Sequence, residues 1–280
     1  MSNIPNLSGW KQQEVDERDH KLMITAPVVL PSKVDNRKSC PPNRDQGGEG
    51  ACTGFAGALT AESCIFKACG KFVDLAPQFL YYMTRVKIEH GSAKNDSGCT
   101  VRDVMKSLAT YGDCLEKSFP YKAGQITKVP TAANIKEALN YKITEYVLVD
   151  SPNLAPKDVL TAVKTQLYLG FILDFGFYVW SSYQQSASNG GGFPFPTKKE
   201  SLDGGHSVRV VGYDDTKVIV NTLDGSKTTG ALLIANSWGT SWGFEGGFGW
   251  LPYDYITKPI NGQRQATDFW KIISENCVKI

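Results

Sequence analysis

Apolar side chains in the first half of the chain recur every three or four residues, the spacing of an amphipathic helix. The pattern is clearest over residues 51–69, and Gly70 provides a natural stop. The residues that recur there at three- and four-residue spacing are Phe55, Ala58, Leu59, Ala61, Ile65 and Phe66. The many Ala and Gly residues of this segment predict close packing on most of its faces. Similar patterns predict three more helices, over residues 76–85, 100–110 and 131–141.

The first 32 residues form a different kind of segment, because they are polar and contain three prolines but little periodicity. We expect them to be an extended leader rather than an element of the core. The leader is shorter than a usual propeptide. Two hypotheses stay open: it covers a functional cleft and inhibits, or it is a strap distant from that cleft.

The second half of the chain changes to the two-residue alternation and β-branched composition of strands. One amphipathic helix is predicted over residues 157–169, and a loop with three consecutive glycines over 181–205. The predicted strands cover residues 143–149, 171–179, 207–213, 217–221 and 231–236. The pattern predicts an α+β fold of two subdomains, helical over residues 33–142 and antiparallel β over 143–280, ending in a C-terminal strap. Clefts between such subdomains are common sites of function.

Composition and charge narrow the classes of function. The 280 residues carry a formal net charge of +2, which gives no reason to expect a nucleic acid or a membrane as partner. The N-terminus has no apolar signal-peptide core, so we expect a protein that is cytoplasmic or exported without a Sec signal. We also expect a monomer. Seven cysteines without a C-x-x-C pair, together with three histidines, make a zinc site or other cofactor unexpected.

Chemistry is suggested first by the stretch "RDQGGEGACTGF", in which Cys52 follows a glycine-rich run and opens a predicted helix. Free N–H groups and the helix dipole at that position favour a thiolate and predict a lowered pKa. Gly47, Gly48 and Gly50 would let a ligand approach closely. The alternative is an inert, buried cysteine.

A thiolate nucleophile needs a base, and the base needs a partner that orients it. Of the three histidines, His20 lies in the leader and His90 in a charged loop, whereas His206 opens a strand beside the long loop. His206 is therefore the best candidate, although any one histidine alone is more often a surface or core residue.

Two further side chains complete a possible site. Asn236, at a strand end, could accept the imidazole N–H of His206, and the nearby indole of Trp238 could shield that bond; the alternative is a packed aromatic-glycine turn. Gln46 could join the Cys52 N–H as a second donor to an oxyanion, unless it is only a surface glutamine.

Together these residues resemble the papain-like cysteine peptidases. The segments "DQGGEGAC", "GGHSVRVVGYD" and "ANSWGTSWGFEGGFGW" are similar to three family blocks in the same order. The resemblance implies a helical left domain and a β-barrel-like right domain with the active-site cleft between them. It implies that Cys52 is the nucleophile and His206 the general base and acid. It further implies that Asn236 orients the histidine, Trp238 covers their bond, and Gln46 donates to the oxyanion.

The resemblance also implies weaker expectations. Gly98, Cys99 and Gly205 would contribute to substrate binding. The chain departs from the family at Glu49, where a half-cystine is usual, and at Thr53, where an aromatic residue is usual. The bridge expected near the nucleophile therefore cannot form, as in bacterial-type members, which fits a reducing location.

Three functions stay open at this point. The first is a cysteine endopeptidase that forms an acyl-enzyme thioester. The second uses the same residues as an amidase, a deubiquitinase-like enzyme or a transferase. The third is an inactive papain-like scaffold that binds a protein or peptide.

Overall fold

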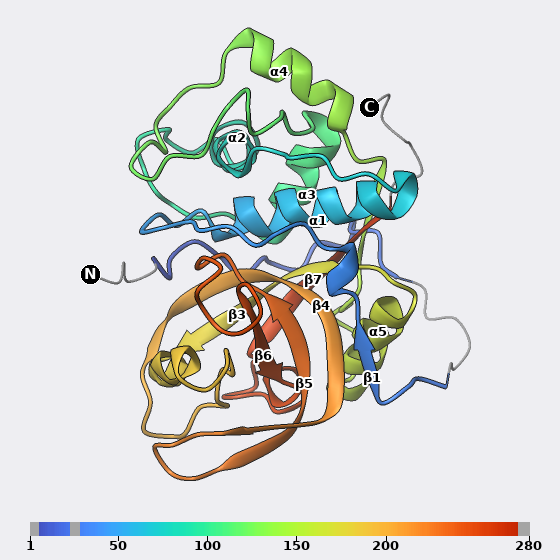
Figure 1. Ribbon diagram of the computed structural model, residues 1–280, viewed down its shortest axis with the longest axis vertical. Helices are drawn as coiled ribbons and strands as arrows, with labels where there is room; N and C mark the ends of the chain where they lie inside the picture. Colours follow the sequence, from blue (N-terminus) through green and yellow to red (C-terminus); the bar gives the residue numbers. More distant parts are fainter. Residues whose placement is uncertain (1–5, 23–28, 274–280) are drawn as a thin grey trace.

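The computed structural model describes residues 6–22 and 29–273, and it forms two layers (Figure 1). Four helices make up most of the upper layer: α1 (Cys52–Cys69), α2 (Pro77–Met83), α3 (Val101–Thr110) and α4 (Ala132–Ala138). A π-helical turn, Thr84–Ile88, prolongs α2, and a 3-10 turn, Leu139–Tyr141, prolongs α4. The four helices predicted in the first half are thus confirmed, with small differences at their ends.

Local signals explain where these helices begin and end. The hydroxyl of Thr100 accepts the backbone N–H of Asp103 at the start of α3, and Thr131 forms a capping box with Asn134 at the start of α4. Gly70, with φ of 68°, ends α1 in the left-handed conformation that glycine adopts without strain.

The lower layer is an antiparallel sheet whose main path runs in the order β2-β7-β3-β4-β5-β6. A short strand, β1 (Lys33–Asp35), pairs with β4 off this path. The other strands are β2 (Glu145–Leu148), β3 (Leu173–Trp180), β4 (Leu202–Val220), β5 (Lys227–Ala235), β6 (Phe248–Pro252) and β7 (Ala266–Ile273). The predicted α+β class is confirmed, and the sheet is open with β2 and β6 at its ends rather than a closed barrel.

Several expectations about the second half were wrong in detail. Residues 207–213 and 217–220 belong to one long strand, β4, which also includes the end of the predicted loop. That loop contains a 3-10 helix, Ser181–Ala187. The C-terminal strap stays a prediction, since residues 274–280 lie outside the described part of the chain. Residues 266–273, for which no strand was predicted, form strand β7 inside the sheet. Its side chains are buried almost throughout, so it lacks the alternation that identifies a strand.

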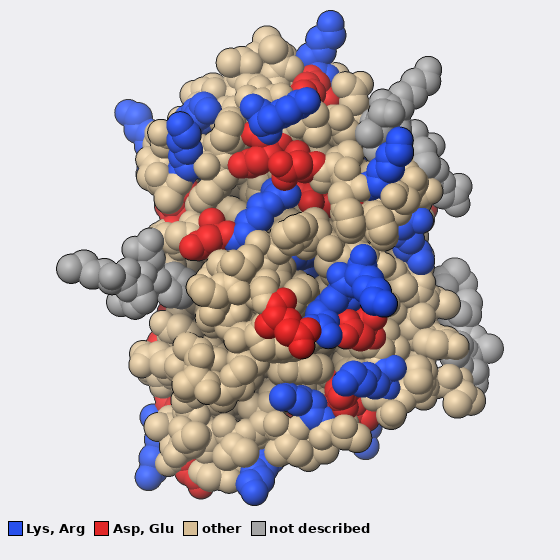
Figure 2. Space-filling model, in the orientation of Figure 1, with Lys and Arg blue, Asp and Glu red and all other residues tan. Residues whose placement is uncertain are grey.

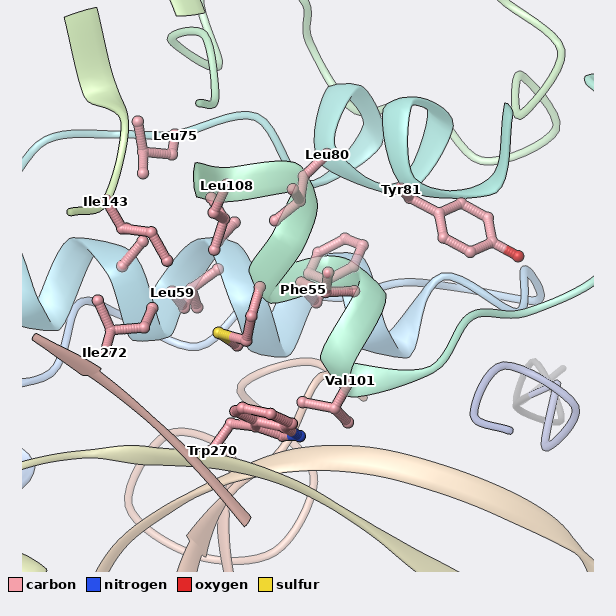
Figure 3. Close-up of a cluster of buried hydrophobic side chains, with 14 of the residues drawn as sticks. Phe55, Leu59, Leu75, Leu80, Tyr81, Val101, Leu108, Ile143, Trp270 and Ile272 are labelled. Atoms are coloured by element: carbon pink, nitrogen blue, oxygen red, sulfur yellow. The ribbon is translucent and has the colours of Figure 1, made fainter. Parts of the chain in front are cut away.

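The core lies where the two layers meet. Figure 3 shows Phe55 and Leu59 of α1 and Val101 and Leu108 of α3 gathered above Trp270 of β7. A second buried cluster lies within the β layer, where α5 (Pro156–Tyr168) packs on β4. The α1 helix therefore lies on the side of the upper layer that faces the sheet, where it packs against β4.

The outer surface has mixed charge. Figure 2 shows Lys and Arg interspersed with Asp and Glu on the face it presents. In the part of the chain that the structure describes, every helix is too short or too polar to cross a membrane. Figure 1 also shows the N-terminal segment running through the junction between the two layers, beside the start of α1.

Candidate active site

Cys52 is the first residue of α1 and its side chain is fully buried. Backbone N–H groups in the first turn of a helix have no acceptor within the helix, so they point toward whatever lies before it. The residues before Cys52 form a turn in which Gly47 has φ of 59°, and the Gly50 N–H donates to the Asp96 carboxylate at 2.7 Å. The nucleophile candidate therefore sits at the end of a braced loop.

His206 lies in β4 and meets Asn236, which follows β5 directly. The His206 Nε2 is 2.8 Å from the Asn236 Oδ1, and both residues are buried. The indole of Trp238 stacks on the imidazole, with ring centroids 4.7 Å apart and planes 26° apart. The His206 Nδ1 has no hydrogen-bond partner among the described residues. The Nε2 side of the imidazole is thus held by Asn236, whereas Nδ1 has a free hydrogen-bonding position.

Gln46 is also buried, and its amide is held at both ends. The Ser237 hydroxyl donates to the Gln46 Oε1, while the Gln46 Nε2 donates to the Glu49 carbonyl at 2.7 Å. A primary amide has two N–H groups, and this bond uses one of them. Ser237 also donates its backbone N–H to the Asn236 Oδ1 at 2.7 Å, which links the two amides through one residue.

Glu49 stands where the family usually has a half-cystine, and it makes a polar brace. Its carboxylate accepts the Tyr121 hydroxyl at 2.9 Å and the Gly124 N–H at 2.6 Å. Cys99, near which the missing bridge would have ended, is a free thiol. Hydrogen bonds thus tie the loop before Cys52 to residues 121–124. Thr53, the other departure, is buried in the first turn of α1.

The leader crosses this site instead of forming a distant strap. The Gly205 N–H donates to the Leu7 carbonyl at 2.7 Å, and the Cys99 N–H donates to the Gly9 carbonyl at 3.0 Å. The Lys11 N–H in turn donates to the Cys99 carbonyl at 3.0 Å. A Cβ placed on Gly9 would lie 2.5 Å from the Cys52 Sγ, so the leader backbone rests on the sulfur. In the described structure, residues 7–11 occupy the cleft as an extended peptide.

This covering changes the electrostatics of the site. Burial raises the pKa of the Cys52 thiol to about 12, against a weaker opposite effect of the Ser207 backbone N–H. Burial also lowers the pKa of His206 to about 4, although its bond to Asn236 acts in the opposite direction. The lowered thiol pKa expected from the helix terminus is therefore wrong for this covered state, because loss of water outweighs the helix dipole. Covered, the pair is a neutral thiol and a neutral imidazole.

The residues expected to contact a substrate lie beside the leader. A Cβ on Gly98 would come 2.4 Å from the Ser8 carbonyl oxygen, and Gly205 pairs with Ser8 in a short parallel bridge. Cys99 pairs with Trp10 in the same way. These glycines let a peptide backbone approach closely. The other two histidines, His20 and His90, are exposed and lie outside this group.

Sequence reasoning missed Ser237 and the side chains that surround Trp10. Ser237 stands next to Asn236 in the quoted block, but nothing in the pattern indicates that it holds Gln46. Trp10 carried one signal, since it is the only Phe, Trp or Tyr among the first 32 residues. Within residues 6–22 and 29–273, no group of three His, Cys, Asp or Glu side chains could hold a metal ion.

The described residues thus include a buried cysteine at a helix start and, separately, a buried histidine that is hydrogen-bonded to an asparagine. Residues 30–255 match the family described as "Papain family cysteine protease". The chain belongs to this family.

Individual proteins agree with this assignment. The chain is 32% identical in sequence to xylellain, a cysteine protease from Xylella fastidiosa. Its fold matches the crystal structure of that protein with a TM-score of 0.76. That match covers 97% of this chain and 98% of xylellain. An uncharacterized peptidase C1-like protein from Acanthamoeba polyphaga mimivirus is 29% identical over 91% of this chain and 73% of its own length. Procathepsin L from Felis catus is 27% identical over 83% of this chain, which spans 65% of that relative.

Proposed function

We propose that this protein is an endopeptidase in which Cys52, His206 and Asn236 act as a triad and Gln46 donates to the oxyanion. The observation that carries the proposal is the bond between His206 Nε2 and Asn236 Oδ1, 2.8 Å long and stacked under Trp238. This bond uses the Nε2 proton and leaves Nδ1 as the acceptor, which is the tautomer that a base requires.

Acylation begins when the leader leaves and a substrate peptide takes its place. His206 Nδ1 removes the Cys52 proton, and the thiolate sulfur attacks the carbonyl carbon of the scissile bond. The carbon–oxygen π bond becomes an oxyanion, which the free N–H of Gln46 and the backbone N–H of Cys52 stabilise. The imidazolium then gives its proton to the leaving amine, the C–N bond breaks, and a thioester on Cys52 remains.

Deacylation repeats these steps with water. His206 removes a proton from a water molecule, whose oxygen attacks the thioester carbonyl. The same two donors hold the second oxyanion, and the C–S bond breaks to release an acid and the Cys52 thiolate. The amide of Asn236 keeps the ring in one orientation through both halves, and Trp238 keeps bulk water away from their hydrogen bond.

The leader acts in this proposal as an inhibitory segment. Supporting it, the Gly9 backbone rests on the Cys52 sulfur, and Leu7, Gly9 and Lys11 make backbone hydrogen bonds that a substrate could otherwise use. Displacement of residues 7–11 would readmit water, lower the pKa of Cys52 and raise that of His206. The ion pair needed for attack would then form.

The test of this function is the identity of the products. The wild type and Cys52→Ala are incubated with a peptide mixture before and after trimming of the leader, and mass spectrometry reads the products. We expect internal hydrolysis that increases on trimming and is absent in Cys52→Ala. Products that carry an added amine, or hydrolysis that persists in Cys52→Ala, would contradict the proposal.

A further inference from the structure

A small cavity lies between helix α1 and strand β4, beside the end of β5. Its volume is about 10 Å³, which is enough for one water molecule or one monatomic ion. The apolar part of its wall consists of side chains of α1, namely Phe55, Ala56 and Leu59. The polar part consists of side chains that can donate hydrogen bonds: Arg44, Ser207, Arg209, Asn236 and Ser237. The cavity therefore borders Asn236, the residue that is hydrogen-bonded to His206.

Arg209 of β4 brings a buried positive charge to this cavity, since only 2% of its surface is exposed. Its Nη2 donates to the Asn43 Oδ1, and its Nη1 donates to the Leu59 carbonyl at 3.5 Å. Both acceptors are neutral, and Arg209 makes no ion pair with any residue that the structure describes. A buried guanidinium without an anion is costly, so this side chain favours the arrival of one.

The ionisable neighbours of Arg209 do not supply that anion. Glu62 is already paired with Arg44 at 2.6 Å. Asp174 stands opposite Arg209 in the pairing of β3 with β4, but burial raises the pKa of its carboxyl group well above the usual range, which favours the neutral acid. Burial also raises the pKa of the Cys40 thiol. Burial lowers the pKa of Arg209 itself, and the nearby charge of Arg44 acts in the same direction. The cavity is thus bordered by an uncompensated positive charge.

Asn236 brings a second, independent donor. Its Oδ1 is occupied by His206 and by the Ser237 backbone N–H, whereas its Nδ2 is buried and has no hydrogen-bond partner within the described part of the chain. The hydroxyl protons of Ser207 and Ser237 are directed elsewhere, to Asp174 and to Gln46. A guanidinium and an amide N–H that line one cavity together favour an acceptor with a negative charge.

We propose that this cavity binds one monovalent inorganic anion of the size of chloride. The ion compensates the charge of Arg209 and accepts the Nδ2–H of Asn236. A tetrahedral anion such as sulfate is too large for the space, and the two guanidinium groups repel a cation. The ion holds the Asn236 amide from the end opposite to His206, so it supports the candidate site without contacting a substrate. This inference goes beyond the proposed peptidase function and does not depend on it.

The first test compares the thermal stability of the full-length wild type in sodium chloride and in sodium gluconate of equal ionic strength. A ligand that binds only the folded chain raises Tm with its concentration. We expect Tm to be at least about 3 °C higher in about 100 mM chloride than in gluconate, and bromide to act like chloride. Equal Tm values in the three salts would mean that the cavity holds water alone, and would overturn the proposal.

Variants locate the effect in this cavity. Arg209→Gln removes the charge, and Ala235→Val fills the cavity from β5, where Ala235 lies opposite Arg209. The difference in Tm between chloride and gluconate should disappear in both. Arg85→Gln is the matched control, since Arg85 is equally buried, donates to the backbone carbonyls of Asn95 and Ile126 and does not line the cavity. A difference that persists in either cavity variant would overturn the proposal.

A direct observation keeps the proposal testable even if the variants fail to fold. Crystals of the full-length wild type are grown from sodium bromide, and diffraction is recorded at the bromine absorption edge. We expect an anomalous difference peak in the cavity, within hydrogen-bonding distance of the Arg209 guanidinium and the Asn236 Nδ2. A cavity without such a peak, while bromide is detected elsewhere on the protein surface, would overturn the proposal. Neither the stability measurement nor the diffraction experiment requires peptidase activity, so failure of the proposed function would leave both results interpretable.

Discussion

The backbone of Gly9 rests directly on the sulfur of Cys52. A Cβ built at position 9 would lie 2.5 Å from the Cys52 Sγ and equally close to the Gly50 carbonyl oxygen. No other residue could occupy this position without movement of the leader or of the loop before α1. The contact joins the N-terminal segment to the nucleophile candidate and explains why a thiol at a helix start is held neutral.

Gly9→Ala in the full-length chain should displace the leader and expose the site. We expect faster hydrolysis of peptides and faster alkylation of Cys52, because the added methyl group has no space between the sulfur and the Gly50 carbonyl. Ser8→Ala is the matched control, since Ser8 is exposed and its hydroxyl donates to the neighbouring Asn6 Oδ1. Equal rates in the two variants would mean that Gly9 does not set access to Cys52.

The ionisation of Cys52 should change when the leader is displaced. The pKa of about 12 in the covered state means that the thiolate is almost absent at neutral pH. In Gly9→Ala, water returns and His206 can accept the proton, so the rise of the alkylation rate with pH should move to lower pH. Iodoacetamide kinetics from pH 4 to 10 measure this shift. An additional His206→Ala substitution should reverse it, and profiles that coincide with the wild type would contradict the account.

The proton balance of His206 gives a stability prediction. Its pKa is about 4 in the folded chain against an ordinary 6.5, so the unfolded state binds the proton more readily. The stability from keeping this ring neutral is present above pH 6.5 and is lost as the pH falls toward 4. Denaturant unfolding of wild type and His206→Gln should show a smaller loss in the variant over this range; identical slopes would argue against a buried neutral ring.

Gln46 should act on the transition state rather than on substrate binding. In the Gly9→Ala background, Gln46→Ala should lower kcat by about 10²–10³-fold with little change in KM, because one donor to the oxyanion is lost. Gln125→Ala, at an exposed position, serves as the control. A rise in KM with unchanged kcat would assign Gln46 to substrate binding.

Glu49 should brace the loop that carries Gln46 and Cys52. Glu49→Ala leaves the Gly124 N–H without its acceptor and removes one acceptor of the Tyr121 hydroxyl, so we expect a loss of about 1–3 kcal/mol in the free energy of unfolding. Glu17→Ala, which removes an exposed ion pair, should cost under about 1 kcal/mol. A double-mutant cycle with Tyr121→Phe measures the coupling, and additive losses would show that the two residues do not act together.

Much of the fold could be predicted from local patterns. The helix that starts at Cys52 and the later helices follow from apolar periodicity and from stop signals such as Gly70. The strand over residues 266–273 could not be predicted in this way, because its side chains are buried almost throughout. The sequence predicts two strands in place of β4, because the polar residues near Asp214 resemble a turn. In the structure the strand continues through these residues, with a shift in its pairing register with β5.

The candidate site, like the fold, could be predicted from the sequence only in part. Cys52, His206, Asn236 and Gln46 lie in short segments whose spacing is informative, and the structure brings His206 and Asn236 together. The covering of Cys52 by Gly9 depends on contacts between distant parts of the chain, so the sequence alone left a strap and an inhibitor as equal hypotheses. The pKa of Cys52 depends on that covering and was therefore predicted in the wrong direction.

The central claim is that Cys52 carries the acyl group during turnover. Full-length Gly9→Ala is mixed with a peptide ester and quenched in acid within the first turnover, and peptide mapping by mass spectrometry locates the acyl group. We predict a hydroxylamine-sensitive thioester on the peptide that contains Cys52, and none in the matching Cys52→Ala chain. Hydrolysis that proceeds with the acyl group on another residue, or in the absence of Cys52, would contradict the account.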